Sequence, residues 1–335
     1  MTVIDVHAHV IPPVLVEAMR AGTAPDGIRL DESGDVPVVV HPQGYRYPLL
    51  RPFFDVEARL AQMDEFGIDV SVLSPAPPLF LYWIDAADAG AAAAAVNDAV
   101  AAMVAERPDR FVGLATLPMQ DPAQAVAELR RAVGELGLRG AQIGPHIEGT
   151  PLDDPALRPV LEAAQELGVP LVLHPYYVGS TPGLDDFYLT NLQGNPWQTA
   201  LAASRLILSG ALDELPGLEL VLVHGGGHLP YQIGRLDHGH RVRPEAKAPK
   251  QAPSDYLRRF HFDSLTHSAE ATAWLVGLVG ADRVLYGTDL PFDMAGGTFD
   301  EQLAGVDDAA ARRAVASEAA TRLFGLDDKE NENRD

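Results

Sequence analysis

Short runs of β-branched and leucine residues alternate along this chain with longer stretches in which apolar residues recur every three or four positions. The short runs predict eight strands, at residues 3–7, 69–74, 111–116, 139–143, 170–174, 219–224, 259–263 and 283–287. The longer stretches predict eight helices, near residues 55–66, 91–107, 122–136, 155–167, 197–213, 229–238, 268–279 and 307–323. Strands that alternate with helices are typical of parallel sheets, and eight such units predict an α/β protein with a (β/α)8 TIM barrel.

Two segments interrupt this alternation. Residues 10–54 contain several Pro and Gly residues and a predicted β-hairpin formed by residues 28–30 and 38–40. Residues 175–196 form a loop with several aromatic side chains. Because both insertions would follow the carboxyl ends of barrel strands, we expect the first to form a small β cap over the catalytic face.

Composition limits the classes of protein to which the chain can belong. Its 335 residues carry a net charge of −22, which argues against nucleic acid and anionic membranes as partners of the whole surface. The absence of Cys excludes disulfides, thiolate nucleophiles and Cys-ligated zinc. We see no signal-peptide pattern and no apolar run near the ~20 residues of a membrane span, so we expect a cytoplasmic location. Residues 1–325 are predicted to form one domain, and residues 326–335 a disordered, mostly charged tail.

The candidate chemistry lies at the carboxyl ends of the predicted strands. His7 and His9 close the first strand, and because alternate side chains share a face, both imidazoles can bind one metal ion. His174 closes the fifth strand, His224 closes the sixth, and Asp289 follows the eighth. Each residue alone could merely cap a loop or a helix. Strand ends converge on one pocket in a barrel, so the five residues together predict a metal site.

The distribution of lysine narrows the kind of metal site. Lysine occurs only as Lys247, Lys250 and Lys329, none of which lies at a predicted strand end, so a carboxylated lysine bridging two metals is not available. We therefore expect one divalent ion, with Zn²⁺ the best match to imidazole and carboxylate ligands and Mn²⁺, Fe²⁺ or Co²⁺ as alternatives. Such a site usually takes three or four protein ligands and a water, which leaves one of the five residues for proton transfer.

Four motifs resemble those of the amidohydrolase superfamily, in the branch of 2-amino-3-carboxymuconate 6-semialdehyde decarboxylase. They are the His-x-His of the first strand, the His-Pro of the fifth, the His-Gly-Gly-Gly of the sixth and the Gly-Thr-Asp-Leu-Pro-Phe of the eighth. Residues 110–120, 141–144 and 234–239 are also similar to that branch, so the resemblance covers nearly the whole chain. It implies that His7, His9, His174 and Asp289 bind the metal and that His224 is an acid–base residue.

The resemblance also implies how a substrate is held. Arg46 and Arg235 would bind carboxylates of a small anionic substrate, with Arg235 reaching in from the neighbouring subunit of a homodimer. A guanidinium suits this role because it forms two parallel charge-assisted hydrogen bonds with a carboxylate. Arg46 could instead be a solvated loop residue, with Arg51 as its rival, and Arg235 could form a structural salt bridge.

Several positions of the predicted pocket wall bear on the substrate. After His174 this chain has Pro-Tyr-Tyr-Val, where the branch usually has Pro-Trp-Asp-Met. It has Asn191 where the branch tends to have Trp, and His228 where the branch usually has a small residue. These departures predict a changed substrate pocket. Three aromatic residues of the branch are kept and could stack on a flat substrate or simply pack in the core, namely Phe80, Trp83 and Phe292.

Together these inferences predict a metal-dependent, non-oxidative decarboxylase of a small conjugated or aromatic carboxylic acid. His224 would take a proton from the metal-bound water, and His224 or Asp289 would protonate the carbon that loses CO₂. The alternative is a hydrolase, hydratase or cyclase of the same family, in which the metal-bound hydroxide attacks the substrate. A non-catalytic protein with a structural metal fits least well, because structural zinc sites are normally closed.

Overall fold

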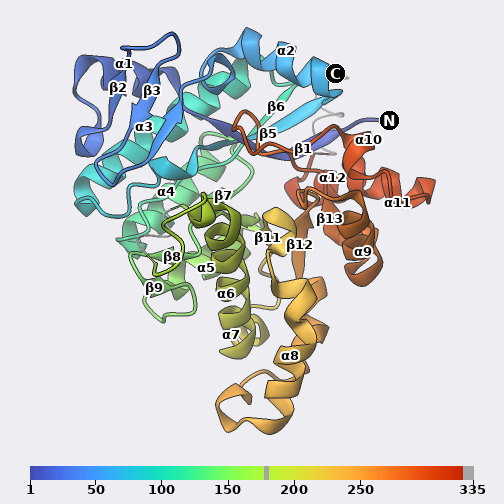
Figure 1. The fold of residues 1–335 in the computed structure, drawn as a ribbon. Coiled ribbons are helices and arrows are strands. Elements are labelled where there is room, and N and C mark those ends of the chain that lie inside the picture. The colour runs from blue at the N-terminus through green and yellow to red at the C-terminus, as the bar shows by residue number, and fades with distance from the viewer. Residues whose placement is uncertain (177–180, 327–335) are drawn as a thin grey trace.

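The structure, a computed structural model, describes residues 1–176 and 181–326 of the chain (Figure 1). The predicted disordered tail falls almost entirely on residues 327–335, which lie outside the described residues, as does Tyr177 of the aromatic loop.

Parallel strands form the centre of the fold. In chain order, those of the described residues are β1 (Ile4–Val10), β5 (Val70–Pro75), β6 (Phe111–Gly113), β7 (Ala141–Ile143), β10 (Leu171–Leu173), β11 (Leu220–Leu222), β12 (Phe260–Asp263) and β13 (Val284–Leu285). They pair in the orders β1-β5-β6 and β7-β10-β11-β12-β13. Parallel bridges from Ala115 to Ala141 and from Ala8 to Leu290 join the two groups into a closed ring. The predicted TIM barrel is therefore confirmed.

Helices follow the strands and surround them (Figure 1). They are α1 (Pro13–Ala21), α2 (Val56–Phe66), α3 (Ala86–Glu106), α4 (Pro122–Gly134), α5 (Arg158–Leu167), α6 (Asn195–Leu208), α7 (Ala211–Glu214), α8 (Leu229–Val242), α9 (Ala269–Val279), α10 (Phe299–Gln302), α11 (Ala309–Arg313) and α12 (Ala319–Phe324). The carboxylates of Asp55, Asp85 and Asp121 cap α2, α3 and α4 by accepting bonds from first-turn backbone N–H groups. The cap at Asp85 explains why α3 begins before the predicted residue 91. The helix predicted at 307–323 is divided, with a π-helical turn over Ala314–Glu318.

A β-bulge in β1 changes the directions in which its histidine side chains point. The pairing of β1 with β5 shifts register between Asp5 and Ala8, so the strand carries a bulge at that point. A bulge re-aims the side chains beside it. As a result Val6 packs in the inner hydrophobic cluster of the barrel, while His7 and His9 both approach Asp289.

The insertion after β1 contains a small antiparallel sheet, here called the insert sheet. It consists of β2 (Arg29–Asp31), β3 (Val38–Val40) and β4 (Arg46–Pro48). The first two strands lie where the hairpin was predicted, and β4 was not predicted from the sequence. A second hairpin, β8 (His146–Ile147) with β9 (Thr150–Pro151), follows β7.

Helix α3 is long and apolar enough, by length and composition alone, to cross a membrane. The sequence-based expectation that no segment reaches this length is therefore wrong. Its contacts are those of a barrel helix, because Val96 and Val100 are buried in the hydrophobic core. The Asn97 amide donates to Thr116 O at 2.9 Å and accepts from Thr116 N at 2.8 Å, which fixes α3 to the segment after β6.

Candidate active site

Four side chains from three strand ends converge inside the barrel and form one group, here called the cluster. One potential ligand atom from each of His7, His9, His174 and Asp289 lies within 4.8 Å of the others. The four residues are between 0% and 7% exposed, so solvent does not satisfy these atoms. His9 Nε2 lies 3.0 Å and His7 Nε2 3.5 Å from Asp289 Oδ1.

The second nitrogen of each imidazole is already occupied. The contacts are His7 Nδ1 to Asp263 Oδ2 at 2.7 Å, His9 Nδ1 to Ser74 Oγ at 3.2 Å, and His174 Nδ1 to Pro175 O at 2.6 Å. A carboxylate and a carbonyl can only accept, and the Ser74 hydroxyl can accept from His9 while it donates to Gln142 Oε1 at 2.8 Å. Each Nδ1 therefore carries the proton, and each Nε2 presents a lone pair to the cluster.

The donor atoms fit a divalent metal ion. The Nε2 atoms of His7, His9 and His174 and Oδ1 of Asp289 are buried without a hydrogen-bond partner among the described residues. Buried polar atoms without a partner are costly, at about 1–3 kcal/mol each. Burial also lowers the pKa of His9 to about 4 and that of His174 well below its ordinary range, so both rings are neutral, as ligation requires. Three imidazoles and a carboxylate form a divalent-metal site.

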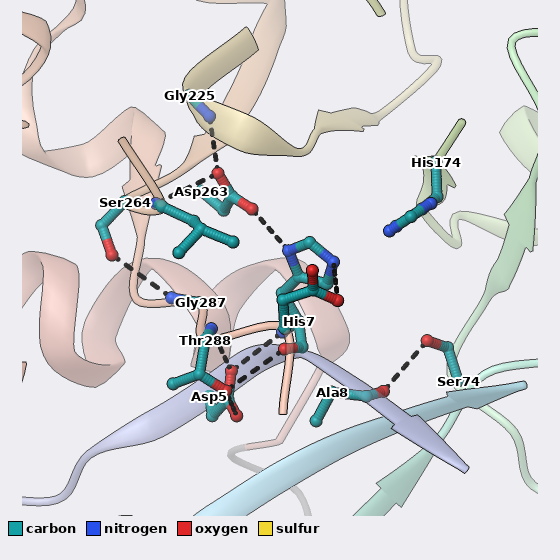
Figure 2. A network of polar contacts seen from close by, with 12 residues as sticks. Asp5, His7, Ala8, Ser74, His174, Gly225, Asp263, Ser264, Gly287 and Thr288 are labelled. Atoms are coloured by element: carbon teal, nitrogen blue, oxygen red, sulfur yellow. Dashed lines mark hydrogen bonds and ion pairs between the residues drawn. The ribbon is translucent and has the colours of Figure 1, made fainter. Parts of the chain in front are cut away.

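Buried polar contacts hold the first and last strands together at this site. Asp5 accepts from the Thr288 hydroxyl at 2.7 Å and from the Thr288 backbone N–H at 3.1 Å (Figure 2). The backbone N–H of Asp289 donates to His7 O at 2.6 Å. The buried guanidinium of Arg59 donates to the carbonyl oxygens of His9 and Leu290. Ligands almost three hundred residues apart in sequence are thereby fixed in one frame.

His224 lies beside the cluster rather than within the set of four. Its ring centroid is 5.4 Å from that of His7 and 5.3 Å from that of His174. It begins the turn after β11 with a φ of 56°, a left-handed conformation that is unfavourable for a residue with a Cβ. Burial lowers its pKa, so this imidazole is also neutral and able to accept a proton.

A cavity with two lobes opens onto the cluster. The insert lobe has a volume of about 480 Å³ and the helix lobe about 440 Å³. Both lobes are lined by Asn191, Asn195, His224, Asp289 and Met294, so they meet at the cluster. The insert lobe is walled mainly by residues 44–53, 175–176 and 291–293, and the helix lobe by residues 225–231, 265–267 and 271–275.

Comparison with known proteins identifies the family. The amidohydrolase family model matches residues 4–326, nearly the whole chain. The chain belongs to the amidohydrolase family. The resemblance inferred from its motifs is confirmed, including the branch of metal-dependent decarboxylases.

Three relatives illustrate the similarity of this amidohydrolase to proteins of known activity. It is 36% identical to 2-amino-3-carboxymuconate-6-semialdehyde decarboxylase of Dictyostelium discoideum over 87% of this chain and 82% of the relative. It is 35% identical to gamma-resorcylate decarboxylase of Rhizobium sp. (strain MTP-10005) over 85% of this chain and 92% of the relative. Among solved structures, a dihydroxybenzoic acid decarboxylase from Polaromonas sp. JS666, with bound manganese and the inhibitor 2-nitroresorcinol, superimposes with a TM-score of 0.78 at 28% identity over 97% of each chain.

The substrate residues expected from the sequence occupy different places in this amidohydrolase. Asn191 and Phe292 line the insert lobe, and His228 lines the helix lobe. Arg46 also lines the insert lobe, but its side chain is 55% exposed and its Nη2 lies 3.1 Å from Asp31 Oδ2. Arg235 is exposed on α8 and lines neither lobe.

Two of the three aromatic residues singled out from the sequence lie outside the cavity lining. Phe80 stacks on Tyr82 at 5.3 Å, and Trp83 stacks on Tyr176 at 6.4 Å while its Nε1 donates to Asp26 at 2.6 Å. Neither Phe80 nor Trp83 lines a lobe, so their position corresponds to core packing rather than substrate stacking.

Sequence reasoning missed three residues that support the site, namely Asp5, Arg59 and Asp263. Asp263 closes the seventh predicted strand, so the rule that selected His174 and His224 could also have selected it. Asp5 and Arg59 carry no such signal, because their partners are backbone and hydroxyl groups that the sequence does not bring together.

Proposed function

We propose that this amidohydrolase is a metal-dependent, non-oxidative decarboxylase of small conjugated or aromatic carboxylic acids. One observation carries the proposal: four buried, unpaired donor atoms meet a neutral histidine at the base of a cavity with aromatic walls. The activities named for its relatives support the reaction, because they are decarboxylases of carboxymuconate-type and dihydroxybenzoate-type acids.

We assign one divalent ion to His7, His9, His174 and Asp289. When bound, such an ion supplies a fixed positive charge that polarises substrate oxygen atoms and stabilises negative charge as it develops. We propose zinc, because three imidazoles and one carboxylate are typical of zinc sites. Manganese, which the Polaromonas structure contains, is the alternative, and metal analysis of purified protein distinguishes the two.

We assign proton transfer to His224. Its neutral ring can accept a proton and hold it on a nitrogen beside the cluster. As the bond between the substrate carbon and its carboxylate breaks, the electron pair stays on the carbon and CO₂ leaves. His224 then gives its proton to that carbon, with Asp289 as the second candidate acid. The net reaction consumes one proton and needs no oxidant.

The insert lobe suits a flat ring. The Phe292 ring contacts those of Phe53 at 5.0 Å, Tyr47 at 5.7 Å and His9 at 5.3 Å, so an aromatic wall ends directly at the cluster. We propose that residues 10–54 act as a cap over this lobe within a single domain of residues 1–325. Arg46, at the edge of the cap, would exchange Asp31 for a substrate carboxylate.

We further propose a homodimer in which Arg235 reaches the neighbouring site. Helix α8 projects from the barrel (Figure 1), and Arg235 lies one helical turn after Tyr231 on the same face. Tyr231 is 80% and Trp274 48% exposed, and the two rings contact each other at the edge of the helix lobe. Exposed aromatic side chains of this kind are enriched in protein interfaces. A second copy covering this face would bring its Arg235 towards the cavity.

The proposal is tested by CO₂ release from a panel of acids. Hydroxybenzoates and aminocarboxymuconate-type acids are supplied to metal-loaded enzyme and to enzyme stripped with a chelator. We expect CO₂ and the decarboxylated product in equal amounts with loaded enzyme only. Turnover of esters, amides or lactones without CO₂ from any acid would favour the hydrolase or cyclase alternative.

A further inference from the structure

Asp263 is a buried carboxylate that contacts two functional parts of the site at once. It is the last residue of β12 and is 0% exposed. Its Oδ2 lies 2.7 Å from His7 Nδ1, and its Oδ1 accepts from the backbone N–H groups of Gly225 at 2.7 Å and Leu265 at 3.3 Å. Figure 2 shows this carboxylate between the His7 ring and the turn that contains Gly225.

The first contact determines how His7 presents itself to the cluster. Because an ionised carboxylate only accepts, it holds the proton on Nδ1 and directs the Nε2 lone pair inward. The other oxygen, Oδ1, already accepts from the backbone N–H groups of Gly225 and Leu265, so the carboxylate cannot rotate without losing these bonds. This geometry keeps Oδ2 directed at His7 Nδ1.

The second contact determines where His224 lies. Four successive residues of the turn have positive φ values, with 56° at His224 and 60°, 75° and 59° at the three glycines that follow. Such a turn persists only when its surroundings hold it. The bond from Gly225 N to Asp263 Oδ1 anchors the turn directly after His224.

We infer that Asp263 is a positioning residue that orients two imidazoles together, His7 through its ring and His224 through the backbone of the following residue. The inference rests on the proposed metal site and on the proposed role of His224. It goes beyond the assignment of His7 as a metal ligand and of His224 as the proton-transfer group, because it makes the relative position of the two rings depend on one carboxylate.

The test uses Asp263→Asn, an isosteric change that leaves one acceptor oxygen. The amide NH₂ must then face either His7 Nδ1 or the N–H groups of Gly225 and Leu265. We expect metal affinity to fall on the order of 10- to 100-fold, and turnover at saturating metal to fall by up to about 10²-fold. The control is Asp213→Asn, which replaces one of the two carboxylate oxygens that accept from the Tyr256 hydroxyl and the Lys250 backbone N–H, away from the site, and should change neither quantity.

A double-mutant cycle between Asp263 and His224 separates a positioning role of Asp263 from a general loss of structure. In a His224→Asn background, Asp263→Asn should still weaken metal binding but should cost little further turnover at saturating metal. Wild-type metal affinity for Asp263→Asn would overturn the His7 part of the inference. Fully additive losses of turnover would overturn the His224 part.

Metal affinity is measured without substrate, by competition with a chromophoric chelator, so it can be read even if no acid is decarboxylated. If Asp263→Asn does not fold, Asp263→Glu replaces it. The longer side chain cannot keep both contacts in a fully buried position, so at least one of the two quantities should fall. Wild-type values of both would contradict the inference.

Discussion

At the scale of single residues, the site depends on which nitrogen of each histidine carries the proton. Three different acceptors, Asp263, Ser74 and Pro175 O, hold protons on the Nδ1 atoms and leave the three Nε2 lone pairs facing one another. These lone pairs have no hydrogen-bond partner among the described residues, and a divalent cation bound between them would satisfy all three. The metal is therefore expected to stabilise the fold as well as to support the reaction.

Replacing one ligand tests this expectation. His9→Ala should lose both the bound metal and the activity, because His9 supplies one of the four ligand atoms and is 0% exposed. Metal analysis should give about one ion per chain for the wild type and for His238→Ala, an exposed histidine outside the cavity. A content near two ions per chain would contradict the single-ion site.

His224 should behave differently from the ligands. His224→Asn is expected to keep the metal while turnover falls on the order of 10²- to 10⁴-fold, the usual range for loss of a positioned acid–base group. Metal content and single-turnover rates, measured on the same preparation, separate the two effects. A metal-free variant would make His224 a ligand and would move proton transfer to another residue.

At the scale of elements, the turn after β11 is the most constrained part of the site. A Cβ at Gly227 would lie 2.0 Å from the backbone oxygen of Pro196, at a φ of 59°. The sequence could place a glycine-rich turn after the sixth strand, because three consecutive glycines follow His224. It could not indicate that α6 closes over this turn.

Gly227→Ala should therefore destabilise the protein strongly. The left-handed backbone alone costs about 1–3 kcal/mol, and the collision with Pro196 adds to it. The matched control is Gly277→Ala in the exposed face of α9, where a Cβ meets nothing within 4 Å. Higher helix propensity should make that variant neutral or more stable by up to about 1 kcal/mol. Denaturant unfolding of both variants measures the difference, and equal stabilities would contradict the described packing.

The elements that sequence predicted best are those whose pattern is local. Buried runs of Val and Leu identified the barrel strands, and their carboxyl ends identified the four clustered residues together with His224. Strand β4 was missed although it pairs with its neighbour β3, because its sequence Arg-Tyr-Pro contains no run of apolar residues. The bulge in β1 was missed because it depends on pairing with β5, a segment distant in the chain. For the same reason the core positions of Phe80 and Trp83 could not be separated from the cavity position of Phe292.

At the scale of the whole molecule, a chain with a net charge of −22 is proposed to bind an anion. The attraction must then be local, supplied by the metal and by a few guanidinium groups. Arg46 lies at the insert lobe, whereas Arg235 lines neither lobe and is proposed to contribute from another copy. The proposed homodimer would therefore link substrate binding to assembly.

Mixed dimers test that link. Arg235→Ala and His224→Ala chains should each be inactive alone and should regain part of the activity when mixed and re-paired, because one site of each mixed dimer then has both groups. Activity of the mixture is compared with that of each variant alone under the same re-pairing conditions. A salt-bridge role for Arg235 within its own chain predicts no rescue and a lower melting temperature.

The central claim is that the cluster with its single metal ion and His224 together replace the carboxylate of the substrate by a proton. Its most direct test is turnover, in D₂O, of an acid substrate labelled with ¹³C in the carboxylate. We predict one labelled CO₂ for each product molecule, and one deuterium on the carbon that carried the carboxylate. Both should disappear when the metal is removed, and both should slow in parallel in His224→Asn. A product that retains the labelled carboxylate and has gained the elements of water would contradict the account.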